Sequence, residues 1–282
     1  MAPKVFIVYC SPAGTTRHAA RIIKESLDGT SAEVLALDLG IFRNHSAFKK
    51  MIRASGAGDC LFVGSPVYRS VAVPPVMSFI KELSKGKNLA AAPFVTWGAV
   101  TSGIALWQMG RALKEKGFVL TGAASVVSEH CMMWRSKAPS GGGRPNAEDD
   151  RKLKEWAREL FERVQLGSVA PLALSDLDYQ PRAHAEEMKQ KIGKPWEIVP
   201  KTVDEKKCTQ CGVCVEECPA AAVSLDPFPA FEETCFDCFN CIRLCPEDAI
   251  GSPLTAEAIE QHIGQLKKKY GEEPETRVFL GG

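Results

Sequence analysis

The chain has 282 residues, enough for about two domains. Its hydrophobic content of 45% and charged content of 24% are typical of a globular protein. A net charge of +1, with no lysine-rich run interleaved with aromatic residues, argues against a nucleic-acid partner. The apolar run at residues 4–10 is too short for a signal peptide and is broken by Ser11 and Pro12, so we expect a cytoplasmic protein.

Residues 1–170 alternate between strand and helix patterns. Short apolar, β-branched runs predict strands, and apolar residues at helical spacing predict helices. The strands are expected at residues 4–10, 32–39, 59–66, 91–97 and 118–128, and the helices at 15–27, 46–55, 74–84, 103–117 and 146–165. This alternation predicts an α/β fold with a doubly wound, five-stranded parallel sheet. In such sheets, ligands bind at the carboxyl ends of the strands.

The longest uncharged run, residues 88–110, has the length of a membrane span. Pro93, Gly98 and Gly103 divide it, and threonine and serine lie between them. We therefore expect a strand, a loop and a helix there, and no membrane span.

The loop after the first strand reads Ser-Pro-Ala-Gly-Thr-Thr and leads into a helix. Small and hydroxyl residues at a helix N-terminus are typical of an anion site, although such helix starts also occur without a ligand. The loop resembles the phosphate loop of flavodoxin, S/T-x-T-G-x-T, except that Ala13 lacks a hydroxyl and Pro12 lacks an N–H. The resemblance implies that an FMN phosphate binds at Ser11, Ala13, Gly14, Thr15 and Thr16.

Two further loops follow the third and fourth strands, where flavodoxin contacts its flavin. The resemblance implies that Tyr68 or Trp97 stacks on the flavin ring, although core packing also explains Trp97. The resemblance to flavodoxin covers residues 3–166, and it implies a flavodoxin-like domain at 1–170 with FMN as cofactor. The ring contacts it implies are Pro66, Val67, Tyr68, Thr96, Trp97, Gly98 and Gly103.

Three segments outside these motifs have open roles. Residues 130–146 form either a lid over a cofactor or a disordered loop. Residues 171–200 form a linker with a short helix at 183–192, and its Trp196 could dock against either flanking part. Residues 251–282 form an amphipathic helix and a tail.

Eight of the eleven cysteines lie in two runs of the form C-x2-C-x2-C-x3-C-P, repeated at an interval of 27 residues. In a reducing compartment this density indicates a metal rather than disulfides. The spacing is that of the bacterial 4Fe–4S ferredoxin motif, whereas zinc sites use four ligands in two pairs. The runs contain Cys208, Cys211, Cys214 and Cys218, then Cys235, Cys238, Cys241 and Cys245.

Residues 201–250 resemble a bacterial two-cluster ferredoxin, a small α+β domain. In that family the fourth cysteine of each run binds the other cluster. The resemblance therefore implies one cluster on Cys208, Cys211, Cys214 and Cys245. It implies a second on Cys235, Cys238, Cys241 and Cys218. Phe228, Phe231, Phe236 and Phe239 are expected either to shield the clusters or to form the domain core.

Charge divides the chain. Residues 1–200 carry 27 basic and 19 acidic residues, a net +8, whereas residues 201–250 carry 4 and 10, a net −6. Opposite fields of this kind favour docking of the cysteine-rich part on the first part.

The two resemblances together indicate a flavodoxin–ferredoxin fusion, an electron-transfer protein with FMN and two 4Fe–4S clusters. Its expected partner is a redox protein, either a ferredoxin-type donor or an acceptor enzyme. Two alternatives remain: a flavin-dependent oxidoreductase that reduces a small substrate at FMN, and a dedicated reductive activator of a corrinoid or radical enzyme. No catalytic residue is assigned, and the oligomeric state is not indicated.

Overall fold

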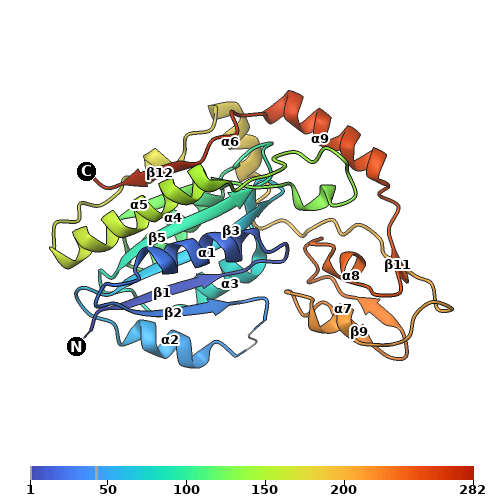
Figure 1. Ribbon diagram of the computed structural model, residues 1–282, viewed down its shortest axis with the longest axis horizontal. Coiled ribbons are helices and arrows are strands. Elements are labelled where there is room, and N and C mark those ends of the chain that lie inside the picture. Colours follow the sequence, from blue (N-terminus) through green and yellow to red (C-terminus); the bar gives the residue numbers. More distant parts are fainter. Residues whose placement is uncertain (1, 42–43) are drawn as a thin grey trace.

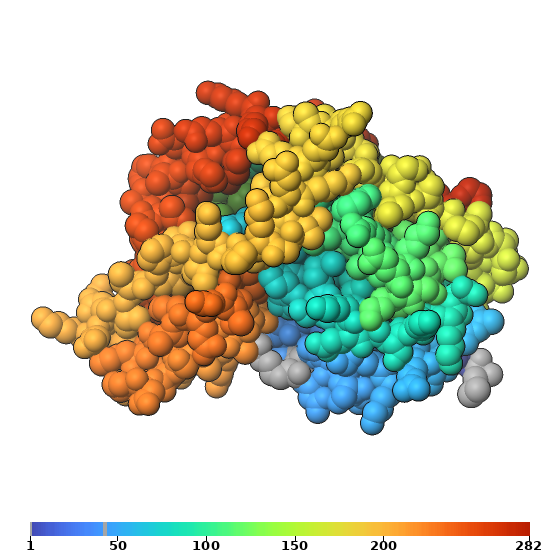
Figure 2. Space-filling model, turned by 180° about the vertical axis from the view of Figure 1, so that it is seen from behind, coloured from blue at the N-terminus to red at the C-terminus, as the bar shows by residue number. Residues whose placement is uncertain are grey.

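The computed structural model describes residues 2–41 and 44–282. A sheet with helices on both faces makes up most of the molecule, and a small cysteine-bearing unit lies beyond the carboxyl ends of its strands (Figure 1). The space-filling view from behind shows this unit, in orange, at one end of the molecule (Figure 2).

Five parallel strands form the centre of the sheet in the order β2-β1-β3-β5-β7. This is the 2-1-3-4-5 order of flavodoxin-like folds, so the predicted doubly wound α/β architecture is confirmed. The strands are β1 (Lys4–Tyr9), β2 (Glu33–Asp38), β3 (Cys60–Tyr68), β5 (Ala90–Trp97) and β7 (Gly122–Val127). Two short strands extend it: β4 (Val71–Ala72) pairs with β3, and β6 (Val119–Leu120) pairs with β5.

Helices bury both faces of the sheet, because side chains alternate along each strand. In β1, Phe6 and Val8 join one core, whereas Val5 and Ile7 join the other. The first core is covered by α2 (Ser46–Arg53), α3 (Pro74–Glu82) and α4 (Ala105–Glu115), and the second by α1 (Thr15–Ser26) and α5 (Ala147–Gln165). Residues 88–110 thus form strand, loop and helix as expected, and no helix in the described residues could cross a membrane.

The C-terminal tail returns to the sheet, which the sequence pattern did not predict. After α9 (Ala256–Tyr270), strand β12 (Arg277–Leu280) pairs antiparallel with β7 and adds an edge strand. The Trp156 indole on α5 donates to the carbonyl of Phe279 at 2.9 Å. The chain therefore leaves the sheet, forms the cysteine-bearing unit and comes back, so both ends of that unit are tied to the sheet body.

The cysteine-bearing unit is small and internally repeated. Helices α7 (Val213–Glu216) and α8 (Asn240–Arg243) are 27 residues apart, as are its two antiparallel ribbons. One ribbon joins β9 (Val223–Leu225) to β10 (Pro229–Phe231), and the other joins β11 (Ile250–Gly251) to β8 (Thr202–Val203). The structure thus has the expected α+β character and the duplication expected from the cysteine runs.

The connecting segments are packed rather than free. In the segment 130–146, which contains the short helix η1 (Cys131–Met133), Met133 packs with Ile259 and Ile263 of α9. The Ser140 hydroxyl donates to the Ala99 carbonyl at 3.1 Å. The linker forms η2 (Leu174–Leu177) and α6 (Arg182–Lys189), and α6 packs against Tyr270 of α9.

Candidate cofactor sites

The loop at residues 11–16 sits at the carboxyl end of β1 and is fixed by its own hydroxyls. Gly14 caps α1 with φ of 87°, a left-handed conformation that suits glycine. The Ser11 hydroxyl accepts from the N–H of Arg17 at 2.8 Å, and the Thr16 and Thr96 hydroxyls lie 2.8 Å apart. These hydrogen bonds fix the conformation of the loop and connect it to Thr96 near the end of β5.

The open loop presents unpaired backbone donors. Within the described residues, no protein acceptor is found for the N–H groups of Ala13, Thr15 and Thr16, and α1 has no acidic residue in its first turn. Free N–H groups at a helix N-terminus can donate to an anion, and the positive end of the helix dipole attracts the same negative charge. A flavin phosphate therefore fits this loop even though Ala13 lacks a hydroxyl.

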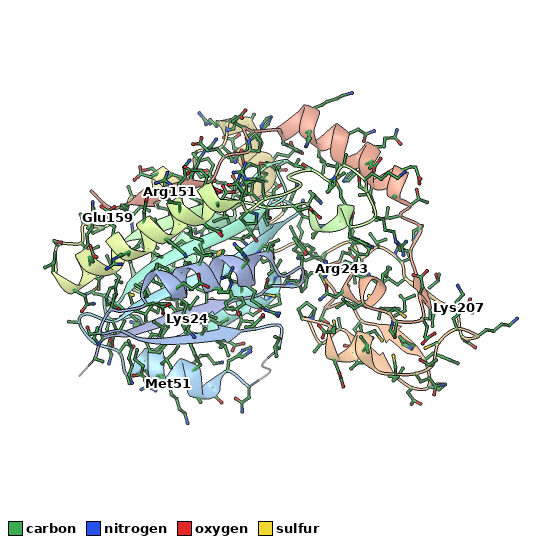
Figure 3. The ribbon with its side chains drawn as sticks, viewed as in Figure 1. Lys24, Met51, Arg151, Glu159, Lys207 and Arg243 are labelled. Atoms are coloured by element: carbon green, nitrogen blue, oxygen red, sulfur yellow. The ribbon has the colours of Figure 1, made fainter. Side chains whose placement is uncertain are left out.

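A cation from the cysteine-bearing unit also reaches this loop. The guanidinium of Arg243 on α8 donates to the carbonyl of Pro12 at 3.3 Å. Figure 3 places Arg243 at the junction between the unit and the sheet body. No local sequence pattern marks this contact, since the two residues are 231 positions apart.

A cavity of about 400 Å³ brings the three predicted flavin loops together. This volume suits a cofactor or small ligand. Eight of the twelve predicted flavin residues line it: Ala13, Thr15, Pro66, Val67, Tyr68, Thr96, Trp97 and Gly98. Ser11, Gly14 and Thr16 shape the loop beside it instead.

Gly103 lies elsewhere and has a different role. A Cβ atom there would lie 2.2 Å from the carbonyl oxygen of Ser70, and φ is +59°. The glycine therefore lets residue 103 pass close under the turn between β3 and β4. By contrast, Gly98 is in the cavity wall, where a Cβ would lie 2.5 Å from the His130 ring.

The two predicted aromatic contacts both line the cavity. Among the residues that the structure describes, the buried indole N–H of Trp97 has no hydrogen-bond partner, whereas the hydroxyl of Tyr68 has the Cys131 thiol beside it. Burial, followed by the charge of Cys131 and Cys238, raises the pKa of Tyr68 well above its usual value, so its hydroxyl stays protonated. Trp97 also packs against Val127 as a core residue. The unpartnered indole N–H of Trp97 in this wall is consistent with a polar cofactor in the cavity.

Remote segments complete the cavity. His130 and Met132 come from the segment 130–146, for which a lid over a cofactor was one of the two expectations, and Trp196 comes from the linker. His262 on α9 also lines the cavity, and the sequence pattern did not reveal it. Burial, together with Lys267 and His262, lowers the pKa of His130 to about 4, so this imidazole is neutral near pH 7. Only the tertiary fold brings these residues together.

The cysteine-bearing unit closes the remaining side of the cavity. Phe236, Asp237 and Phe239 line it, and all three lie between the cysteines of the second run. The Phe236 ring lies 5.8 Å from that of Tyr68 and 6.2 Å from that of Trp196. Of the two docking options for Trp196, the linker residue thus packs on the interface itself.

Four cysteines surround a small cavity at the outer end of the unit: Cys208, Cys211, Cys214 and Cys245. Burial raises the pKa of the Cys214 thiol, and the charges of Cys211, Cys208 and Cys245 raise it further. The fourth member of this group therefore comes from the second cysteine run.

The other four cysteines form a second group. Burial raises the pKa of Cys238 strongly, and Cys218, Cys241 and Cys235 add to it through their charge. The N–H of Ala222 donates to Cys218 at 3.2 Å, and the equivalent Ala249 donates to Cys245 at 3.3 Å. The grouping is the one that crossed ligation requires.

The thiols do not converge on one point. Among the described residues, no three His, Cys, Asp or Glu side chains form a group that could hold a metal ion. Four thiolates on one zinc at about 2.3 Å would lie about 3.8 Å apart. In a 4Fe–4S cubane each thiolate binds its own iron, so the sulfurs stand farther apart.

A buried cation adjoins the second group. The Lys201 side chain is 1% exposed, and its ammonium lies 2.8 Å from the Asp237 carboxylate and 3.5 Å from the Cys235 sulfur. Burial alone would lower the pKa of Lys201, but Asp237 and Cys235 hold it above its usual value. The repeat places Phe228 at the position equivalent to Lys201. The first cysteine group therefore has no lysine at the position where the second group has Lys201.

Contacts between the unit and the sheet body are mainly apolar. Phe236, 1% exposed, belongs to the main core of the sheet body, and Cys238 packs against the same core. Among the described residues, the one ion pair between residues 1–200 and 201–250 joins Arg135 to Asp248 at 3.2 Å, with both side chains exposed. Such a pair contributes less than about 1 kcal/mol. Opposite net charge is therefore a minor part of this contact.

Residues 201–224 match the family model of the 4Fe-4S binding domain. No curated protein sequence matches the chain. A flavodoxin from the domain Archaea is 18% identical, with 57% of this chain and 99% of that chain covered and a TM-score of 0.44.

Two further solved structures give similar values. Oxidised flavodoxin 1 from Bacillus cereus is 16% identical, with 56% of this chain and 97% of that chain covered and a TM-score of 0.43. The rubredoxin oxygen:oxidoreductase from Desulfovibrio gigas is 21% identical with a TM-score of 0.47. The match covers 58% of this chain and 36% of that protein, so this chain spans about a third of that protein's length.

The assignment of the fold rests on the strand order, and that of the cysteine-bearing unit on the family match. The chain joins a flavodoxin-like α/β fold to a ferredoxin-type 4Fe–4S region, as expected of a flavodoxin–ferredoxin fusion.

Proposed function

We propose that the chain is an electron-transfer iron–sulfur flavoprotein with FMN in the 400 Å³ cavity and two 4Fe–4S clusters on the two cysteine groups. FMN exchanges one or two electrons and each cluster exchanges one, so together they can connect a one-electron partner to a flavin. The domain division at residues 170, 200 and 250 is part of this proposal.

One observation carries the proposal. Residues 236, 237 and 239 alternate with cluster cysteines and also line the cavity of the flavin loops. A single stretch of chain thus separates the proposed second cluster from the proposed flavin. Phe236 and Phe239, 1% and 2% exposed, fill this separation with buried apolar groups and keep water out of it.

The two cysteine groups differ in their access to solvent. Cys238 packs against the core of the sheet body, whereas Cys211, its counterpart in the repeat, is exposed. We infer that the group with Cys211 faces an external redox protein and the group with Cys238 faces the flavin. The unit as a whole is acidic, with 4 basic and 10 acidic residues at 201–250, so a partner with a basic docking face fits it.

A second candidate function is favoured by a further cavity. A hollow of about 470 Å³ adjoins the flavin cavity, sharing Arg69, His130, Trp196 and His262 with it. A small substrate bound there would lie beside the flavin. This supports a flavin-dependent oxidoreductase fed through the clusters.

The crossed cysteine groups can be tested by comparing variants in pairs. Cys218→Ala should give the same EPR change as Cys238→Ala, because both remove a ligand of the second cluster. Cys245→Ala should match Cys211→Ala. Cys60→Ala, in the sheet, is the control and should keep about eight irons per chain. If Cys218→Ala matched Cys211→Ala instead, each run would hold its own cluster.

Gly14→Asp tests the phosphate loop. A carboxylate about 4 Å from the phosphate repels it by roughly 4 kcal/mol at an effective dielectric near 20, approaching a thousandfold loss of FMN affinity. Gly14→Ala is the matched control, because it carries the same backbone strain without charge. Fluorescence titration should show this loss for FMN and a much smaller one for riboflavin. Equal losses for both flavins would place the phosphate elsewhere.

Lys201→Gln tests the buried charge. Glutamine can still donate to Asp237, but it removes the positive charge that favours the more negative, reduced cluster. An EPR-monitored redox titration should show the reduced-to-oxidised ratio of the second cluster fall at least tenfold at fixed potential, about 59 mV for one electron. Lys201→Arg should shift it little, and the first cluster should not change. A shift of both clusters together would refute the local effect.

A further inference from the structure

The hollow beside the flavin cavity is enclosed by segments distant in sequence. Its walls come from the turn between β3 and β4, the linker at 191–197, the segment after β7 and α9. Figure 2 shows it from behind: cyan and green atoms lie at its floor, between the red atoms of α9 and the yellow atoms of the linker. Its volume of about 470 Å³ is that of a small-molecule site.

Cations dominate the charged groups of this hollow. Arg69, Lys191 and Lys194 line it, and Glu197 is the carboxylate among its lining residues. In the described part of the chain, none of these three cations forms an ion pair with a carboxylate. The neighbouring Lys269, by contrast, pairs with Glu187 at 2.8 Å.

Arg69 is held over the hollow by contacts that leave its charge uncompensated. Its guanidinium lies 5.2 Å from the centre of the Trp196 ring, and it donates to the backbone carbonyl of Glu197 rather than to a carboxylate. The turn that carries it is fixed, because the carbonyl of Ser70 accepts from the N–H of Ile104 at 2.8 Å.

Lys191 has charges of both signs around it. Burial lowers its pKa; Glu187 counters this, but Lys269 and Arg69 lower it further. The imidazole of His130, with its low pKa, adds no charge near pH 7. An anion in the hollow would offset the repulsion that Lys269 and Arg69 exert on Lys191.

The lining also has an apolar side. Trp196, Tyr270, Leu266 and Val71 face the hollow. A ligand with an organic body as well as charged groups would therefore bury apolar surface against them. The continuity with the flavin cavity at Gly98 and His130 places such a ligand next to the proposed flavin.

We propose that this hollow is a binding site for a small organic polyanion, a molecule with two or more carboxylate or phosphate groups, held by Arg69, Lys191 and Lys194 beside the flavin. The link between this ligand and the flavin rests on the second candidate function, the flavin-dependent oxidoreductase. The proposal adds the chemical class of the ligand to that function.

Isothermal titration calorimetry of the full chain, purified without oxygen, tests the site. Citrate is the carboxylate probe, pyrophosphate the phosphate probe and glycerol the neutral control, all at matched ionic strength. At least one polyanion should bind saturably with about one site per chain, and glycerol should not. If only citrate or only pyrophosphate binds, the result shows whether the site recognises carboxylate or phosphate groups.

Variants distinguish a specific binding site from non-specific electrostatic attraction. Lys191→Gln should weaken binding of the probe about tenfold, since a hydrogen bond to a charged group is lost, and Lys191→Arg should restore most of it. Lys207→Gln is the matched control: it removes an exposed lysine of the cysteine-bearing unit, labelled far from the hollow in Figure 3, and should leave the affinity unchanged.

Two results would overturn the proposal: no saturable binding of either polyanion, or equal weakening by Lys191→Gln and Lys207→Gln. The flavin absorbance spectrum, recorded in the same titration, tests the position. Saturation should shift it, and binding without a shift would place the ligand away from the flavin. A chain that binds the probe but no flavin would refute the proposed function while leaving the polyanion site intact.

Discussion

The packing of Phe236 between Tyr68 and Trp196 is the contact on which the arrangement of the molecule depends. Phe236 belongs to the cysteine-bearing unit by sequence but to the core of the sheet body by burial. Burying a phenylalanine side chain stabilises a structure by about 1.5–3 kcal/mol, more than an exposed ion pair provides. This contact fixes the second cysteine group beside the flavin loops, and β12 fixes the chain after the unit by returning it to the sheet.

The duplicated unit is symmetric in sequence but not in its surroundings. Cys211 and Cys238 are equivalent in the repeat, yet one is exposed and the other packs against the body. Lys201 and Phe228 are equivalent too, yet only the first places a charge beside a cysteine of the second group, Cys235. Docking against the sheet body thus gives two similar cysteine groups different solvent access and different charge, which suits an ordered passage of electrons from the surface inward.

Local features of the sequence predicted most of the fold. The apolar strands, the Asn146 capping box of α5 and the threonine cap of α9 each depend on neighbouring residues, so a short window contains the whole signal. The two cysteine runs could be recognised because their spacing is a local pattern, whereas the ligand sets come from the resemblance to two-cluster ferredoxins and stay a prediction. By contrast, β12 is a short strand that forms only because β7 leaves an open edge. The cavity residues His130, Trp196 and His262 come from three distant segments, and no local pattern marks them. Gly103 approaches the backbone of Ser70 closely, and a sequence can indicate that a close approach is needed but not which group is approached.

We propose that the second cysteine group and the flavin loops form one path for electrons within a single chain. To test this, the anaerobic protein is reduced rapidly at its proposed clusters, and flavin absorbance is followed at several protein concentrations. Transfer within one chain should give a first-order rate that does not depend on protein concentration. A rate that rises in proportion to concentration would mean that electrons reach the flavin by encounters between molecules, and would contradict it.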